Sequence, residues 1–255
     1  MHSLRGAAQM DGQRHVHHDS DALADSVAGR LIALWQAAPR TRPWHIALAG
    51  GNTPRAIYAR LRHRQAELDW SAVEVWFGDE RDVAPDHPDS NYRMAREALL
   101  AHVPIPDAHV HPMRSPHLDL RRDCARYARL LDTRLPRRDG WPRFDVILLG
   151  LGSDGHTASL FPNTCILHQR EQTVAPVHVA QLGTWRMSLT LPVLEQAEHL
   201  LFVVSGAAKA AVLKRAWARP EDAALPVNRI RPHGTVEWHV DGAAAGAVAA
   251  PEQRP

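Results

Sequence analysis

The stretch that decides the fold is residues 144–162, which read FDVILLGLGSDGHTASLFP. It begins with a short, mostly apolar run, typical of a buried strand, and continues into a glycine-rich turn. Further apolar runs occupy residues 44–49, 73–77 and 199–204, and each is followed by a polar turn that contains glycine. Helical patterns lie between these runs. Strands that alternate with helices predict an α/β fold: a doubly wound, mainly parallel sheet flanked by helices, in a single domain.

The remaining elements extend this pattern over most of the chain. Asp19, Ser20 and Asp21 precede one helical pattern, and Ser90 and Asn91 precede another, so these residues are expected to cap the two helices. A further helix is expected at residues 118–135, and further strands at 173–179, 186–191 and 235–240, of which the last alternates like an edge strand. We expect residues 1–18 to be a flexible N-terminal segment, residues 19–241 to form the domain, and residues 242–255 to be a flexible tail.

Composition and charge restrict the class of protein. Of 255 residues, 45% are hydrophobic, which argues against disorder, and the formal net charge is only +2 with scattered basic residues, so no nucleic-acid-binding patch is expected. No apolar run reaches the ~18 residues that a membrane span needs. Cys124 and Cys165 are far apart without a CxxC, which favours a reduced, cytoplasmic location without a disulfide or zinc site. His15, His17 and His18 lie in the expected flexible segment, where a designed metal site is not expected.

The turn at residues 150–155, GLGSDG, matches the GxGxxG pattern of dinucleotide-binding proteins. Two features argue against that function. Pro162 closely limits the helix that should follow, and no acidic residue ends the next expected strand, at 173–179, where a partner for the ribose would lie. We therefore expect no nucleotide cofactor.

A histidine follows this glycine-rich turn directly. Ligands of open α/β sheets bind beyond the carboxyl ends of the strands, so the glycine-containing turns are expected to meet at one site. His156 would face that site, where a neutral imidazole can take a proton from water and return one to a leaving oxygen. The alternative is an ordinary surface or core histidine.

Groups that bind anions occur at the same turns. The turn that precedes Pro54, a residue suited to the first position of a helix, contains Gly50, Gly51, Asn52 and Thr53. Backbone N–H groups at such a helix start bind phosphate and other anions, although the segment is alternatively just a tight turn. Lys209 is one of two lysines in an arginine-rich chain, and Lys209 and Arg186 add positive charge. The residues alone therefore predict an acid–base site for a phosphorylated small molecule.

Extended to residue 162, the glycine-rich segment closely resembles the G-x-G-x-D-G-H-T-A-S-L-F-P signature of the 6-phosphogluconolactonases. Other segments resemble family elements in the expected order: residues 49–54 its SGGxTP loop, 78–81 with 90–91 its GDER…SN segment, 186–190 its R-x-T-L-T element, 205–209 its G-x-x-K element, and 234–241 its ending. The resemblance spans residues 19–241. Ala49, Ser188 and Val227 depart from the usual pattern, which concerns loop contacts more than the reaction.

The resemblance implies hydrolysis of 6-phospho-D-glucono-1,5-lactone to 6-phosphogluconate in the oxidative pentose phosphate pathway, without a metal or cofactor. His156 would be the general base, Asp79 would orient a hydroxyl or His156, and Arg81 would stabilise the oxyanion or another substrate oxygen. The residues expected to bind substrate or phosphate are Gly50, Gly51, Asn52, Thr53, Asn91, Gly152, Arg186 and Lys209. We expect a monomer or a weak homodimer.

Alternatives stay open for individual residues and for the function. Asp79 and Arg81 are alternatively part of a solvated charge run, Asn91 a simple helix cap, and Asp154 is expected to shape its turn. The fold implied by the resemblance is shared with glucosamine-6-phosphate deaminases and ribose-5-phosphate isomerases. An amino-sugar-phosphate deaminase or isomerase is therefore one alternative, and a sugar-phosphate sensor without turnover is another.

Overall fold

The computed structural model describes residues 12–39, 41–116 and 119–246. Its centre is a six-stranded sheet in which every neighbouring pair of strands is parallel. In spatial order the strands are β1 (Gln13–His17), β11 (Thr235–Asp241), β10 (His199–Val204), β7 (Val146–Leu149), β2 (Trp44–Leu48) and β3 (Val73–Phe77). All residues of β2, β3 and β7 are buried, as expected for strands covered on both faces. The predicted parallel α/β sheet is confirmed.

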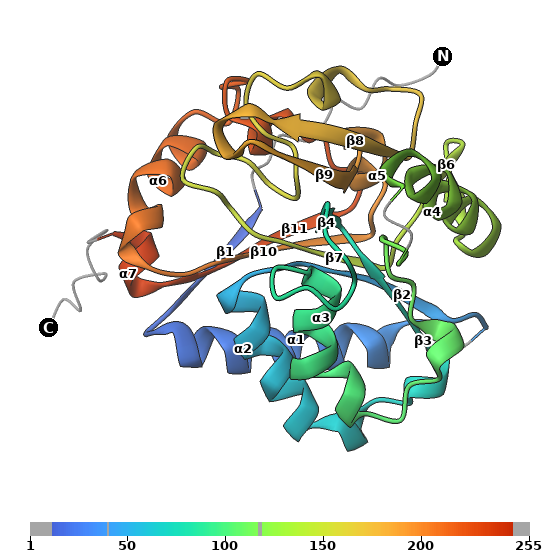
Figure 1. Ribbon diagram of the computed structural model, residues 1–255. Coiled ribbons are helices and arrows are strands. Elements are labelled where there is room, and N and C mark those ends of the chain that lie inside the picture. Colours follow the sequence, from blue (N-terminus) through green and yellow to red (C-terminus); the bar gives the residue numbers. More distant parts are fainter. Residues whose placement is uncertain (1–11, 40, 117–118, 247–255) are drawn as a thin grey trace, which may run out of the picture.

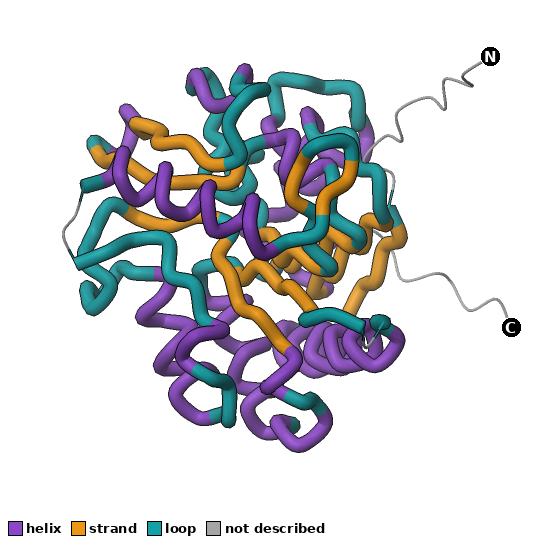
Figure 2. Tube along the Cα trace, turned by 90° about the vertical axis from the view of Figure 1, so that its right-hand side faces the viewer, coloured by secondary structure: helices purple, strands orange, loops and turns teal. Residues whose placement is uncertain are grey.

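Helices cover both faces of this sheet (Figure 1). One group lies together on one face and comprises α1 (Ser20–Ala37), α2 (Asn52–His63) and α3 (Asn91–Ala98). The helices elsewhere are α4 (Leu120–Arg134), α5 (Leu191–Glu195), α6 (Ala210–Ala218) and α7 (Gly242–Ala245). Figure 2 shows the strands between the helical layers from the side. Within the described ranges, no helix is both long and apolar enough to cross a membrane.

Two smaller sheets complete the fold. A three-stranded antiparallel sheet consists of β4 (Asp79–Arg81), β9 (Thr184–Leu189) and β8 (Val174–Val179), and β5 (Arg137–Arg138) pairs with β6 (Trp141–Pro142). The strands expected at 173–179 and 186–191 therefore exist, but they lie outside the parallel sheet. Because β4 directly follows β3, the small sheet stands beyond the carboxyl end of β3. It brings Arg81 of β4 opposite Arg186 of β9.

Of the expected cap residues, Asp19 and Ser90 are the N-caps of the two helices. Oδ1 of Asp19 accepts a hydrogen bond from the backbone N–H of Ala22 at 2.8 Å, at the start of α1. The Ser90 hydroxyl accepts one from the N–H of Arg93 at 3.2 Å, at the start of α3. Each cap satisfies a first-turn donor that the helix itself leaves unpaired. The helix expected at residues 118–135 begins at Leu120, and Leu118 lies outside the described residues.

The prediction that residues 1–18 are flexible is wrong for residues 13–17. Residues 13–17 form β1, an edge strand that pairs in parallel with β11, so the ordered domain begins before residue 19. The sequence QRHVH has only one apolar residue, Val16, so the strand carries no hydrophobic signal and is held by pairing with its neighbour. It also makes β11 an internal strand rather than the expected edge. Residues 1–11 lie outside the described ranges.

The expected flexible tail is corrected in its first part as well. Residues 242–245 form the short helix α7, and Oδ1 of Asp241 caps it by accepting the N–H of Ala244 at 2.7 Å. The aspartate that ends β11 is thus also the N-cap of the helix that follows. Residues 247–255 lie outside the described ranges.

Candidate active site

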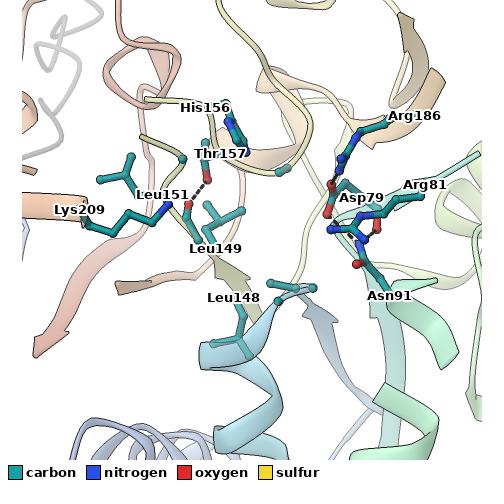
Figure 3. A pocket seen from close by; sticks show the side chains of 17 residues that line it. Asp79, Arg81, Asn91, Leu148, Leu149, Leu151, His156, Thr157, Arg186 and Lys209 are labelled. Atoms are coloured by element: carbon teal, nitrogen blue, oxygen red, sulfur yellow. Dashed lines mark hydrogen bonds and ion pairs between the residues drawn. The ribbon is translucent and has the colours of Figure 1, made fainter. Parts of the chain in front are cut away.

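A pocket of about 310 Å³ lies beyond the carboxyl ends of β2, β3 and β7. Separate segments of the chain line it: Ala49–Gly51 after β2, Gly78, Asp79 and Arg81 after β3, Asn91 of α3, the end of β7 and its following loop up to Ala158, Arg186 of β9, and Lys209. Figure 3 shows these side chains converging from different elements. Of the residues predicted for the site, only Asn52 and Thr53 do not line the pocket.

His156 stands in the loop after β7 and is paired with a carboxylate. Its Nδ1 lies 2.6 Å from Oδ1 of Asp154, which also accepts the backbone N–H of His156 at 3.1 Å. The ring points into the pocket (Figure 3). With Nδ1–H donating to Asp154, the lone pair of Nε2 is left available for a proton. The carboxylate beside His156 is thus Asp154, for which we expected only a role in the turn, and not Asp79.

The glycines of the loop are required by this pairing. A Cβ atom on Gly152 would lie 2.1 Å from Nδ1 of His156 and 2.7 Å from Oδ1 of Asp154, so any side chain there would displace the pair. Gly155 has a φ of +84°, a conformation that glycine adopts without steric cost. The backbone N–H of Gly152 donates to the carbonyl of His156 at 2.8 Å and closes the loop.

An aromatic ring supports His156 from one side. Phe161 stacks on the imidazole with ring centroids 4.0 Å apart, and the guanidinium of Arg186 lies 5.6 Å from the centroid of the same ring. Burial lowers the pKa of His156 from its usual 6.5, against the opposing effect of the Asp154 carboxylate. The imidazole is therefore neutral at pH 7 and able to act as a base. The sequence alone did not indicate that Phe161 packs against His156.

Two arginines stand side by side at the pocket. Arg81 and Arg186 are paired across β4 and β9, and both line the cavity. The Nε atoms of both are buried without a hydrogen-bond partner among the described residues. Burial lowers the pKa of Arg186, Asp79 opposes this effect, and the like charge of Arg81 adds to it. Two adjacent cations with unused donors form a site suited to an anion.

Asp79 is the carboxylate nearest to these arginines, and its own environment is crowded. Its Oδ2 accepts the hydroxyl of Ser159 at 2.6 Å and lies 4.0 Å from Nη1 of Arg186. The side-chain amide of Asn91 donates to the backbone carbonyl of Asp79 at 2.9 Å and, more weakly, to its Oδ1 at 3.3 Å. Ser159 comes from the loop that carries His156, so Asp79 ties that loop to the arginine pair. Ser159 belongs to the glycine-rich segment of residues 144–162, but the sequence alone gave no partner for its hydroxyl.

Asn91 and Glu80 hold the segment that follows β3. Glu80 is buried and accepts the backbone N–H groups of Arg81, Asn91 and Tyr92, each at 2.8 Å. Burial raises the pKa of Glu80, and the backbone donors oppose this. A Cβ on Gly50 would lie 1.8 Å from Oδ1 of Asn91, so the turn after β2 packs directly on this amide. Asn91 thus lines the pocket and also braces its walls.

The turn before α2 contributes backbone rather than side chains. Gly50 and Gly51 line the pocket, whereas the exposed Asn52 and the partly buried Thr53 do not. Gly51 has a φ of +104° and occupies the N-cap position of α2, where no side chain caps the helix. The first N–H groups of α2 are therefore free of a side-chain cap at the edge of the cavity.

Lys209 reaches the pocket from the loop after β10, on the side opposite the arginine pair (Figure 3). The start of this loop is anchored by Asp241, whose carboxylate accepts the hydroxyl of Ser205 at 2.5 Å and the N–H of Gly206 at 3.0 Å. The Lys209 ammonium makes no hydrogen bond or ion pair with the described residues. Positive charge thus lies on two sides of the cavity. Among the described residues, those of the pocket do not form a cluster of three metal-ligating side chains.

Comparisons with known proteins agree on one family. The sequence model of the glucosamine-6-phosphate isomerases/6-phosphogluconolactonase family matches residues 18–238. A 6-phosphogluconolactonase of Synechocystis is 43% identical over 77% of this chain and 81% of its own length. The human 6-phosphogluconolactonase is 37% identical over 91% of each chain.

Solved structures show the same likeness. The 6-phosphogluconolactonase of Trypanosoma brucei superposes with a TM-score of 0.83 at 30% identity and covers 94% of this chain and 99% of its own. A monomeric glucosamine-6-phosphate deaminase superposes with a TM-score of 0.76 at 19% identity, over 91% of this chain and 98% of its own, which shows a shared fold.

Proposed function

The chain belongs to the glucosamine-6-phosphate isomerase/6-phosphogluconolactonase family, and we propose that its pocket hydrolyses 6-phospho-D-glucono-1,5-lactone to 6-phosphogluconate with His156 as the general base. This hydrolysis of a carboxylic ester is a step of the oxidative pentose phosphate pathway. The observation that carries the residue assignment is the His156–Asp154 pair, which leaves Nε2 of a neutral imidazole for a water in a pocket rich in cations.

The reaction needs one proton relay. Nε2 of His156 takes a proton from water as the water oxygen bonds to the lactone carbonyl carbon and an oxyanion forms. The bond between that carbon and the ring oxygen then breaks, and the imidazolium returns a proton to the leaving oxygen. Asp154 is a positioning residue here: it selects the tautomer with hydrogen on Nδ1 and stabilises the imidazolium that forms. A sugar lactone is a reactive ester, so water activation and oxyanion stabilisation are sufficient.

The substrate has two sites of negative charge, and the pocket offers cations for both. The phosphate is an anion throughout the reaction, whereas the carbonyl oxygen of the lactone acquires negative charge only as the water adds to the carbonyl carbon. We assign Arg186, Lys209 and the backbone N–H groups at Gly50, Gly51 and the start of α2 to the phosphate, and Arg81 to the oxyanion or another substrate oxygen. Asp79 keeps Arg186 and the Ser159 loop in place and is free to accept a substrate hydroxyl. Asn91 and Gly152 shape the walls.

The setting of the enzyme is part of the proposal. Cys124 and Cys165 are both free thiols, which favours a reducing compartment such as the cytoplasm. The residues that we assign to the reaction all belong to this chain, and we propose that it acts as a monomer or a weak homodimer.

The test is hydrolysis of freshly prepared lactone, measured by acid release after subtraction of the spontaneous rate. The protein should accelerate the reaction, and His156→Ala should remove the acceleration while His63→Ala, a change at an exposed histidine, should keep it. Equal rates for the wild type and His156→Ala would refute the role of His156. Ammonia release from glucosamine 6-phosphate, without lactone hydrolysis, would instead indicate the deaminase.

A further inference from the structure

A second group of ligating side chains lies away from the pocket, where the edge strand β1 meets β11. His15 is paired in register with His239, and Glu237 stands two residues earlier on the same face of β11. Nε2 of His239 lies 3.5 Å from Oε2 of Glu237, and Nε2 of His15 lies 3.9 Å from the same oxygen. The three ligand atoms all lie within 4.8 Å of one another. None of the three residues lines the active-site pocket.

The two imidazole nitrogens that face the carboxylate approach it only to 3.9 Å for His15 and 3.5 Å for His239. Nε2 of His15 and Nε2 of His239 are buried atoms without a hydrogen-bond partner among the described residues. On its other side, Nδ1 of His239 lies 3.2 Å from Nε2 of His17. When His239 donates its Nδ1 proton to His17, the lone pair of its Nε2 is directed towards Glu237. The two nitrogen lone pairs then face the carboxylate oxygen without a donor of their own, which is unfavourable for buried acceptors.

A neighbouring arginine orients the carboxylate of this group. Arg30 of α1 donates to both oxygens of Glu237, at 2.6 to 3.1 Å, and fixes the carboxylate. A carboxylate that is oriented by a hydrogen-bond donor outside the ligand set is usual at metal sites.

We propose that His15, His239 and Glu237 bind a divalent transition-metal ion of the zinc class, which fastens the edge strand β1 to β11. Two imidazoles and one carboxylate are a donor set that zinc accepts, with a water in the fourth position. For bonds of about 2.0–2.1 Å, tetrahedral ligands stand roughly 3.3 Å apart, so the ligands close in only modestly on binding. The His15 side chain is 40% exposed, which gives the ion a path from solvent.

The site is independent of the proposed catalysis. The family match covers residues 18–238, so His15 and His239 lie outside it. Arg30 of α1 contacts Glu237, and in Figure 1 α1 lies on the face of the sheet opposite the small antiparallel sheet that carries Arg186. The metal would therefore stabilise the start of the domain and would not take part in hydrolysis.

The test is Zn²⁺ binding by the full chain after removal of metals with a chelator. Calorimetric titration should give one ion per chain, and His15→Gln should weaken binding by about tenfold or more. The matched control is His18→Gln, because His18 is in the same segment but its side chain is 93% exposed; it should bind like the wild type. Added Zn²⁺ should also slow amide hydrogen exchange in β1 of the wild type.

The outcomes separate this site from the active site. No stoichiometric binding to the wild type, or equal binding by His15→Gln, would overturn the proposal. His239→Gln is a second variant, but it changes a buried residue, so His15→Gln decides if that protein fails to fold. Lactone hydrolysis by His15→Gln should stay at the wild-type rate, whether or not Zn²⁺ is present.

Discussion

Nδ1 of His156 lies 2.6 Å from Oδ1 of Asp154, and only Gly155 separates the two residues in the chain. Such a short connection makes the pair a property of one loop, and the hydrogen bond determines which ring nitrogen carries the proton. The pair therefore makes predictions that can be tested without reference to the rest of the fold.

Replacement of Asp154 by Asn should impair catalysis while the protein stays folded. The amide keeps the shape of the carboxylate but not its charge, so the imidazolium loses its partner; we expect kcat to fall roughly 10- to 100-fold. Because the carboxylate raises the pKa of His156, its loss should also move the acid limb of the kcat/KM profile to lower pH. Asp107→Asn, at an exposed aspartate, should change neither quantity. A lower kcat with an unmoved acid limb would reduce Asp154 to a structural role.

The pH profile of the wild type should show an acid limb below the usual histidine value. Burial lowers the pKa of His156 from 6.5, and only the neutral imidazole accepts the proton of water. Activity is therefore expected to persist at pH 6.5 and to fall as the pH drops through the lowered pKa. Titration of the ring by NMR in the free enzyme checks the value independently. An acid limb clearly above 6.5 would contradict the assignment.

A comparison of lactone substrates with and without phosphate can show whether Lys209 binds the phosphate or the reacting end of the substrate. Lys209→Met should raise KM for the phosphorylated lactone by roughly tenfold or more, since a hydrogen bond to a charged group contributes about 1.5–3 kcal/mol. The same change should have little effect on the unphosphorylated glucono-1,5-lactone, which has no phosphate to bind. Lys214, the other lysine, is exposed and outside the pocket, so Lys214→Met is the control. Equal losses on both substrates would place Lys209 at the reacting end instead.

Gly152→Ala should disable the His156–Asp154 pair by steric displacement. The added Cβ would lie 2.1 Å from Nδ1 of His156, so the ring has to move and activity should fall to near that of His156→Ala. At Gly150 a Cβ would meet nothing within 4 Å, and Gly150→Ala should leave the NMR titration of His156 intact. A Gly152→Ala protein with full activity would mean that the loop adapts and that the pair is not required.

The sequence predicted the fold class well because its main strands are strongly apolar and short. β3 at Val73–Phe77 and β10 at His199–Val204 agree with the predicted residues, since both are mostly apolar; Glu74 is the one charged residue in β3. β1 was missed because its polar sequence resembles a surface segment. Its place in the sheet depends on the free edge of β11, which lies more than two hundred residues away in the chain.

In the site, too, some features depend on residues adjacent in the sequence and others on contacts between distant segments. By itself, the sequence determined the glycine turn after β7, the position of His156 beside it, and the presence of a helix near Pro54, which begins at Asn52, two residues earlier than expected. These features depend on neighbouring residues in one turn. Only the tertiary structure decided that Arg81 lies opposite Arg186 and that Asp79 receives Ser159. Strand register and burial set these pairings, and both arise from contacts between segments that meet only when the chain packs.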